Sequence, residues 1–309
     1  MAGSSKKAIY AALVGNGLIA VTKFAAAATS GSAAMFSEGI HSLVDTGNQV
    51  LLLHGLRQAE KPADRRFPFG HGKEIYFWSF VVAILVFALG AGVSIYQGVH
   101  HLDNPEPITN ITINYLVLGA AIIFEGGALY VAMKEFNAHR GDTGFFRAVA
   151  IGKDPSLFVV VFEDTAALVG LLIALAGLFA YQLTGNMLFD ALASIGIGLV
   201  LAVTAIWLAI ESKGLLIGES ASPETVTAIR ELVEADERIA SINEVATLHM
   251  GPNHIIVMLS VDFFDGLDSS LVETATTELN LRIKASDAAV RRVFIEAERA
   301  GDHRNVVDA

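Results

Sequence analysis

Ionisable side chains in two apolar segments are the residues of this sequence best suited to bind a cation. His41 and Asp45 stand four residues apart, so a helix presents them on one face, within a run apolar enough to span a bilayer. A second apolar run, about 120 residues later, carries Glu163 and Asp164. Ionisable groups at membrane depth are costly and usually face a partner, a substrate or a water-filled path. Two sets in separate segments therefore predict one shared cation site.

The residue types and spacing indicate a divalent ion. Asn48 continues the stripe of His41 and Asp45, so one imidazole and several oxygens lie within reach of each other, as zinc and similar ions require. A helix-stabilising His-Asp pair is the alternative. Glu163 and Asp164 point about 100° apart, so one is expected to be a ligand and the other secondary. In the alternative for this pair, both carboxylates bind Lys23 or backbone donors.

Other polar residues in the apolar runs have roles outside the predicted ligand set. Ser37 and Glu38 are expected near the outer end of their segment, where water can solvate them. Lys23 and Glu125 either pair with each other or relay protons. Asp190 opens an apolar run after a Gly-Asn turn, where a carboxylate favours a helix N-terminus, so capping is preferred over transport.

The composition places the chain among membrane proteins. Mean hydropathy is +0.53, and 53% of residues are hydrophobic against 17% charged. There is no cysteine, so a metal must be held by imidazole and oxygen ligands, and no prosthetic group is expected. Asp and Glu outnumber Lys and Arg by 32 to 21, which argues against nucleic acid as a partner.

Six apolar segments have about the length that a bilayer requires. They cover residues 7–29, 32–57, 75–98, 112–134, 156–181 and 187–210. Lys and Arg precede the first segment and fill the second-to-third and fourth-to-fifth connections, whereas the alternate connections contain none. The positive-inside rule then places both termini in the cytoplasm. With no Arg-rich presequence, a bacterial cytoplasmic membrane is favoured over an organelle. Small residues at four-residue spacing predict close helix packing, namely Gly90, Ser94, Gly98, Ser194 and Gly198.

A soluble domain is predicted after the last segment, so the expected division is 1–210 for transport and 211–309 for a cytoplasmic regulatory or dimerisation domain. Ser222 and Pro223 predict a helix start, and the order that follows is α-β-β-α-β, a small α+β (ferredoxin-like) domain. Residues 211–309 contain 9 basic and 18 acidic residues. The negative charge serves either to concentrate cations or simply to keep the domain soluble.

These segments together resemble the cation diffusion facilitator family. The resemblance rests on Gly39-Ile40-His41 through Asp45, the loop Phe67-Pro68-Phe69-Gly70-His71-Gly72-Lys73, the six segments and the α+β tail. It is closest to the zinc transporter nine-like branch, through residues 41–49, 153–156 and 163–167. The resemblance implies a homodimeric exporter that exchanges zinc, or sometimes manganese, iron, cobalt or cadmium, for protons. It also implies a site built from the second and fifth segments.

The sequence departs from the family pattern at several metal sites. Val160 stands where the fifth segment of the family normally has a histidine, so Glu163 or Asn48 is expected to supply the fourth ligand. The resulting ligand set is rich in oxygen, which weakens the case for zinc over manganese or iron. Asp64 and His71 match a loop metal site of some relatives, although Phe67 occupies its third position; His71 could equally orient a turn. In the tail, the residues expected at the surface are His249, His254, Glu296, Glu298 and His303.

The predicted mechanism is alternating access, in which His41, Asp45 and Asp164 take up the metal when deprotonated and release it when protonated. Two other classes stay open. One is a membrane-anchored metal sensor or assembly protein that does not transport. The other, less favoured, is a channel or a carrier of organic cations, because no aromatic cage accompanies the paired acids.

Overall fold

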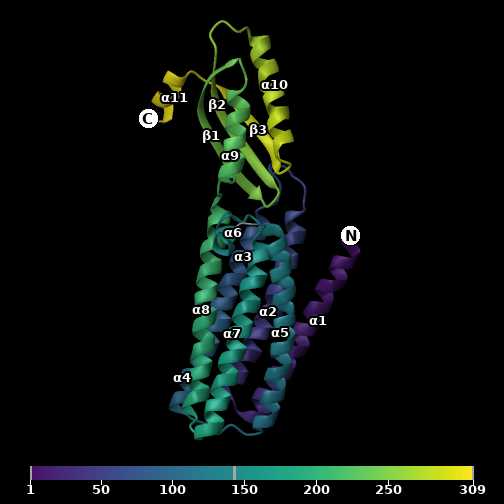
Figure 1. The fold of residues 1–309 in the computed structure, drawn as a ribbon, viewed down its shortest axis with the longest axis vertical. Coiled ribbons are helices and arrows are strands. Elements are labelled where there is room, and N and C mark those ends of the chain that lie inside the picture. Colours follow the sequence, from purple (N-terminus) through teal and green to yellow (C-terminus); the bar gives the residue numbers. More distant parts are fainter. Residues whose placement is uncertain (1, 142–143, 308–309) are drawn as a thin grey trace. The chain divides into compact units, whose positions relative to one another are not determined.

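A computed structural model describes residues 2–141 and 144–307. The chain forms two compact units, one of residues 1–57 and 75–213, and the other of residues 58–74 and 214–309. The first unit is a bundle of long helices and the second is a small α+β unit (Figure 1). This arrangement confirms the predicted fold class, a helical membrane domain with a small C-terminal α+β domain.

The helical unit is built from long helices with short connections. Its helices are α1 (Ala2–Ser30), α2 (Ala33–Ala59), α3 (Glu74–Leu85), α4 (Gly92–Asp103), α5 (Ile111–Arg140), α6 (Phe145–Ile151), α7 (Pro155–Thr184) and α8 (Leu188–Ile217). A six-residue π-helical stretch, η1 (Val86–Ala91), joins α3 to α4, so that the three form one continuous helical segment. Figure 1 shows α2, α5, α7 and α8 running alongside one another, while the N-terminal part of α1 leans away from them.

Four helical segments among the described residues are long and apolar enough to cross a membrane. They are Glu74–Asp103, Ile111–Ala138, Phe158–Thr184 and Leu188–Ile217. These correspond to the third to sixth predicted spans. Helices α1 and α2 have sufficient length, and spans over them stay a prediction. In α2 the polar residues of the candidate site lower the hydropathy. The short helix α6 was not predicted, because seven residues carry too little periodicity.

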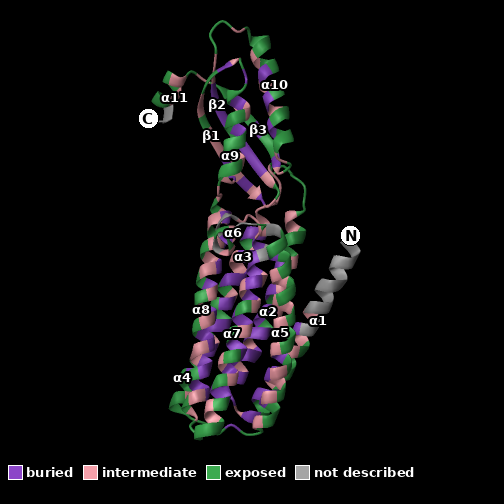
Figure 2. Cartoon of the chain, viewed as in Figure 1, coloured by how far each residue is buried: buried purple, intermediate pink, exposed green. Residues whose placement is uncertain are grey.

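The bundle contains the close helix contacts that the small residues predict. A Cβ atom placed on Gly98 would lie 2.6 Å from Ile195 Cγ1 and 2.8 Å from the Ala191 carbonyl oxygen, and Gly198 meets Ile95 in the same way. Ser194 bonds Ser37 Oγ at 2.7 Å and donates to the Ser94 carbonyl at 2.8 Å, which connects α2, α4 and α8. Buried residues follow the inner faces of these helices in Figure 2. The prediction of close packing is confirmed.

Asp190, at the start of α8, caps a different helix from the one expected. Its carboxylate accepts hydrogen bonds from Ser32 Oγ and from the backbone N–H groups of Ala33 and Ala34, the first residues of α2. Ser32 Oγ accepts in turn from the Met35 N–H. Capping is therefore confirmed as the role of Asp190, but the capped N-terminus is that of α2, because the two helix ends lie side by side. This cap fixes the helix that carries His41 and Asp45.

The α+β unit has a three-stranded sheet in the order β1-β2-β3. Its elements are α9 (Pro223–Glu234), β1 (Ile239–Gly251), β2 (His254–Phe263), α10 (Ser269–Ser286), β3 (Val290–Ala297) and α11 (Ala300–Val307). β1 pairs antiparallel with β2, and β2 pairs parallel with β3. The predicted order α-β-β-α-β is confirmed; the short α11 was not predicted. Ser222 Oγ accepts from Thr225 N–H, which confirms the predicted cap of α9.

One apolar core holds this unit together. Val257, Leu259 and Val261 of β2 are buried together with residues of α9 and α10, such as Ile229 and Leu279. The loop after α2 belongs to the same unit, because Gly72 lies against the backbone of Met250 and Gly251, where a side chain would not fit. Phe69 also packs edge-on against Phe294 of β3. These contacts explain the glycine next to His71 in the loop motif.

Candidate metal transport site

One face of α2 carries the candidate ligands into the bundle. His41 and Asn48 are essentially inaccessible, and Asp45 is 9% exposed. His41 Nδ1 and Asp45 Oδ1 are 3.5 Å apart, which is longer than an ordinary hydrogen bond. The predicted stripe of His41, Asp45 and Asn48 is thus present and faces inward, as the four-residue spacing requires.

Several polar atoms on this face are buried without a hydrogen-bond partner among the described residues. They include both ring nitrogens of His41, Asp45 Oδ1 and Asn48 Oδ1. An unsatisfied buried donor or acceptor costs about 1–3 kcal/mol, so such groups are uncommon and call for an explanation. An imidazole and carboxylate or amide oxygens are ligands that zinc, manganese and iron accept. The donor set therefore fits a divalent cation as the transported substrate.

Helix α7 brings its carboxylates to the same region. Asn48 Nδ2 donates to Glu163 Oε1 at 2.7 Å, which joins α2 to α7 at the level of the stripe. Glu163 is buried and Asp164 is half-buried. Asp45 interacts electrostatically with Glu163, Asp164 and also Glu125 of α5. Residues of α2, α5 and α7 thus form one acidic region. Glu163 and Asn48, both considered for a fourth ligand, bind each other here.

The candidate ligands do not converge on one point in this conformation. Among the residues that the structure describes, no group of three or more His, Asp or Glu side chains is placed to hold a metal ion together. His41 and Asp45 approach each other on α2, while Asp164 interacts electrostatically with Glu125. The ligand-bearing faces of α2 and α7 are therefore adjacent, and coordination requires side chains or helices to move closer. Assignment of these five residues as the metal site stays a prediction.

Lys23 has a partner that the sequence did not indicate. Its ammonium group donates to Glu38 Oε2 at 2.9 Å and to Ser42 Oγ at 2.8 Å, and both charged side chains are fully buried. Of the two alternatives for Lys23 and Glu125, direct pairing is replaced by the pair of Lys23 with Glu38, and a proton relay stays a prediction. The expectation that Ser37 and Glu38 are solvated was wrong, because both are buried. The physical reason is the tight turn at Gly31. It folds α1 back along α2, so Lys23 and Glu38, nearly equidistant from the turn, lie level with each other.

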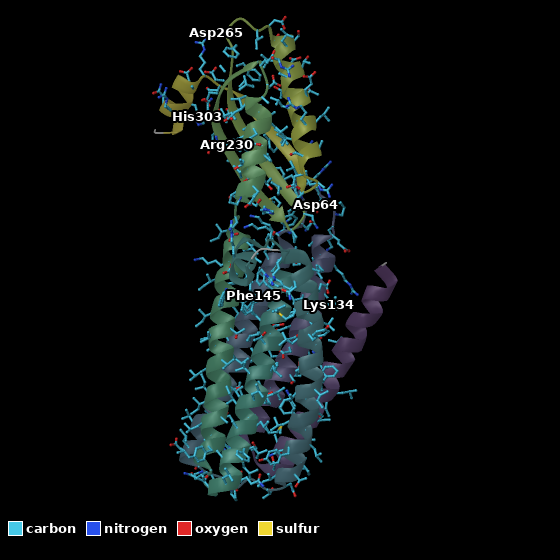
Figure 3. The ribbon with its side chains drawn as sticks, viewed as in Figure 1. Asp64, Lys134, Phe145, Arg230, Asp265 and His303 are labelled. Carbon is cyan, nitrogen blue, oxygen red and sulfur yellow. The ribbon has the colours of Figure 1, made fainter. Side chains whose placement is uncertain are left out.

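The loop and tail candidates form smaller contacts in the α+β unit. His71 Nε2 lies 3.1 Å from Asp64 Oδ2, and the Phe67 ring packs on the imidazole. Hydrogen bonds from the Phe67 N–H and from His71 lower the pKa of the Asp64 carboxyl. This pair shapes the turn, which agrees with the alternative role given to His71. Asp64 lies well apart from His303 in Figure 3, so these two residues do not share a site.

The tail residues correct one expectation. His249 is buried and contacts the Gly251 carbonyl through Nδ1, so its predicted position at the surface was wrong. It lies near the end of a strand whose inner face joins the core. Glu296 is exposed as expected, His254 is partly buried, and His303 Nδ1 lies 2.7 Å from Glu298 Oε2.

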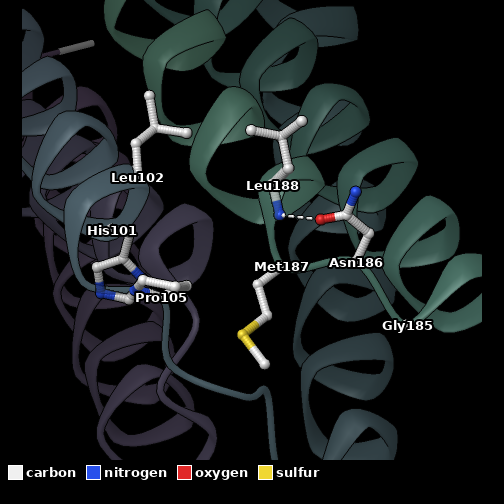
Figure 4. A pocket seen from close by; sticks show the side chains of 7 residues that line it. All are labelled: His101, Leu102, Pro105, Gly185, Asn186, Met187 and Leu188. Carbon is white, nitrogen blue, oxygen red and sulfur yellow. Dashed lines mark hydrogen bonds between the residues drawn. The ribbon is translucent and has the colours of Figure 1, made fainter.

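A pocket in the helical unit lies at the end of α4 and at the turn between α7 and α8. His101, Leu102 and Pro105 line one side, and residues 185–188 line the other (Figure 4). Asn186 Oδ1 accepts from the Leu188 N–H and so caps α8. His101 is the one strong metal ligand among these residues, and it comes from the helix end, whereas the acidic region involves the interior of α2 and α7. We assign the pocket no role in metal binding.

Comparison with known proteins agrees with the fold and the ligand chemistry. Residues 9–217 match the family model of the cation efflux transmembrane domain. The chain therefore belongs to the cation efflux, or cation diffusion facilitator, family. This result confirms the resemblance noted in the sequence. Membership of this family agrees with the expectation of a transporter rather than an enzyme.

Individual relatives share moderate identity over most of the chain. It is 36% identical over 259 residues to the human "Proton-coupled zinc antiporter SLC30A9, mitochondrial", covering 83% of this chain and 46% of that protein. It is 32% identical over 261 residues to metal tolerance protein C4 of Arabidopsis thaliana, covering 84% and 57%. An uncharacterized transporter of Synechocystis is 26% identical over 283 residues, covering 87% and 84%. The chain thus spans about half the length of the first two relatives.

Proposed function

We propose that this chain exports a divalent cation, with zinc as the first candidate, in exchange for protons. The observation that carries the proposal is the buried face of α2, where His41 and Asp45 present unpartnered metal-binding atoms and Asp45 interacts electrostatically with the acidic residues of α7. Membership of a metal transporter family and similarity to a protein named as a proton-coupled zinc antiporter support the same function.

In the proposed mechanism, His41, Asp45 and Asp164 bind the cation, and Glu163 and Asn48 complete the coordination. The five groups share one region of the bundle, which supports a single site. A metal and a proton compete for the same lone pairs, so binding of one expels the other. Alternation of access between the two sides of the membrane then couples the two flows. A homodimer with cytoplasmic termini in a bacterial cytoplasmic membrane, and a regulatory or dimerisation role for the soluble domain, belong to this proposal.

The test is metal-driven proton flux in vesicles that contain the purified protein and a pH-sensitive dye. We expect Asp45→Asn and Asp164→Asn to abolish the flux, because each removes a charge that both metal and proton require. Asp265→Asn is the control, since that carboxylate is almost fully exposed in the α+β unit. Flux at the wild-type level in both site variants would exclude the proposal. Zinc binding without any flux in the wild type would favour the metal sensor.

Manganese or iron remains the second candidate for the cargo, and one observation favours it. Val160 stands one helical turn before Asp164, so the set contains a single imidazole and is otherwise composed of oxygen ligands. Val160→His adds a second imidazole on the face of Asp164. We expect this variant to raise the ratio of zinc to manganese transport, measured by competition in the same vesicles. An unchanged ratio would mean that residue 160 does not face the cation.

A further inference from the structure

The buried ion pair of Lys23 and Glu38 is not used by the mechanism above. Lys23 is the only Lys or Arg that is buried among the residues whose exposure the structure describes. Its ammonium group has two partners, Glu38 Oε2 and Ser42 Oγ, at 2.9 and 2.8 Å. Burying two charges is costly, and pairing them repays this cost only with good geometry, so a buried pair is weak evidence of a purely stabilising role.

The surrounding helices are shaped to accept this pair. On α7, Gly170 leaves room for Glu38, since a Cβ atom there would lie 2.5 Å from Glu38 Oε1. On α2, Gly39 leaves room for the ring of Phe24, the neighbour of Lys23, since a Cβ atom at residue 39 would lie 2.9 Å from that ring. Glu38 Oε1 itself is buried without a hydrogen-bond partner. The pair is therefore enclosed by α1, α2 and α7, and one carboxylate oxygen is unused.

The pair also lies next to the candidate metal ligands. Ser42, which holds the ammonium group, is adjacent to His41 and one helical turn from Asp45. Electrostatic interactions connect Lys23 with His41, Asp45 and Glu125. The acidic groups of this region are Glu38, Asp45, Glu125, Glu163 and Asp164, so the single ammonium group is their fixed counter-charge. A cation entering this region is repelled by Lys23 and attracted by the carboxylates.

We propose that Lys23 is a tethered cation that competes electrostatically with the transported metal and thereby weakens metal binding enough to permit release. This inference rests on the proposed function and assigns a role to a residue outside the ligand set. Glu38 and Ser42 hold the ammonium group at a fixed place, so its repulsion is present in every transport cycle. Removing the positive charge leaves Glu38 as an additional anion beside the site, and removing Glu38 leaves the ammonium group uncompensated.

The test is the zinc dissociation constant of the purified 309-residue chain, measured by competition with a fluorescent chelator. We expect Lys23→Gln to bind zinc about tenfold more tightly or better, because unit charges still interact over one to two helical turns in a partly buried region. Glu38→Gln is expected to bind about tenfold more weakly. The double variant Lys23→Gln/Glu38→Gln should return to within a few fold of wild type. Lys134→Gln, which removes an exposed lysine of α5, is the control and should not change the affinity.

A merely structural ion pair would give a different pattern. Both single variants would then lower the melting temperature while zinc affinity stayed the same or changed in the same direction, and that pattern would overturn the inference. If Lys23→Gln does not fold, Glu38→Gln and the double variant still test the proposal. Zinc binding by Glu38→Gln that is tighter than in wild type, or unchanged, contradicts it. Failure of the proposed function is distinct, since the wild type would then show no zinc-driven proton flux at all.

Discussion

The contact of α4 with α8 allows a quantitative prediction from atomic distances. In Gly98→Ala the new Cβ atom would lie 2.6 Å from Ile195 Cγ1, 2.8 Å from the Ala191 carbonyl oxygen and 2.9 Å from the Ile195 nitrogen. Two of these neighbours are backbone atoms of α8 and cannot rotate away. Ordinary contacts are near 3.5–4.0 Å, so the two helices must separate by about 1 Å at this point. Separation also loosens the reciprocal contact of Gly198 with Ile95.

We expect this change to lower the free energy of unfolding by about 1–3 kcal/mol, the usual cost of overpacking a close-packed interior. Replacing glycine by alanine also favours a helix by up to about 1 kcal/mol, which acts in the opposite direction. Gly119→Ala in α5 isolates that second effect, because no atom lies within 4 Å of its new Cβ. The difference between the two variants is then the cost of the clash.

The assay is thermal unfolding in detergent, followed by the fluorescence of Trp78 and Trp207. Gly98→Ala is expected to melt several degrees below Gly119→Ala, and Gly119→Ala to melt at or above the wild-type temperature. Zinc should still raise the melting temperature of both, since neither glycine belongs to the candidate site. Equal melting temperatures for the two variants would refute the close α4–α8 contact as described.

Three further predictions concern the parts that position the site and the soluble unit. Asp190→Ala removes the cap of α2 and is expected to cost about 1–2 kcal/mol of stability, with faster hydrogen exchange at the start of α2 than in wild type; unchanged exchange there would contradict the cap. Hydrogen bonds from Arg238 lower the pKa of the Asp236 carboxyl, so its stabilising contribution is complete above pH ~4 and is lost as the pH falls below that value. In Asp236→Asn the free energy of unfolding should therefore fall less steeply with decreasing pH below about 4. An unaltered pH dependence would argue against this role of Asp236. Gly72→Ala forces a side chain against the Met250 carbonyl, so the backbone amides of residues 58–74 should exchange hydrogen faster than in wild type. Protection equal to wild type would show that the loop tolerates the added methyl group.

Local patterns predicted most of the elements, because their signals lie within a few consecutive residues. Long apolar runs predicted the helices over Glu74–Asp103 and Leu188–Ile217, and Ser222 with Pro223 predicted the start of α9. Spacing alone placed His41 and Asp45 on one face. The short helices α6 and α11 escaped prediction because one or two turns leave no periodic signal.

Partners across the fold were harder to predict from the sequence. The partner of Lys23 depends on how α1 lies against α2, and a local pattern cannot choose between Glu38 and Glu125. The nearly equal sequence separations of Lys23 and Glu38 from the Gly31 turn were the available signal. Asp190 was correctly expected to cap, but its target lies 157 residues earlier in the chain. His249 was misplaced because the side of its strand that faces the core depends on sheet packing.

The central claim is that α2 and α7 together hold the transported cation, and locating the metal tests it most directly. Crystals of the 309-residue chain grown with zinc, measured on both sides of the zinc absorption edge, would show the ion by its anomalous scattering. We predict a peak within bonding distance of His41, Asp45 and Asp164, and no such peak in Asp45→Asn. Zinc found in the helical unit away from these residues, or bound at His41 and Asp45 with no ligand from α7, would contradict the account.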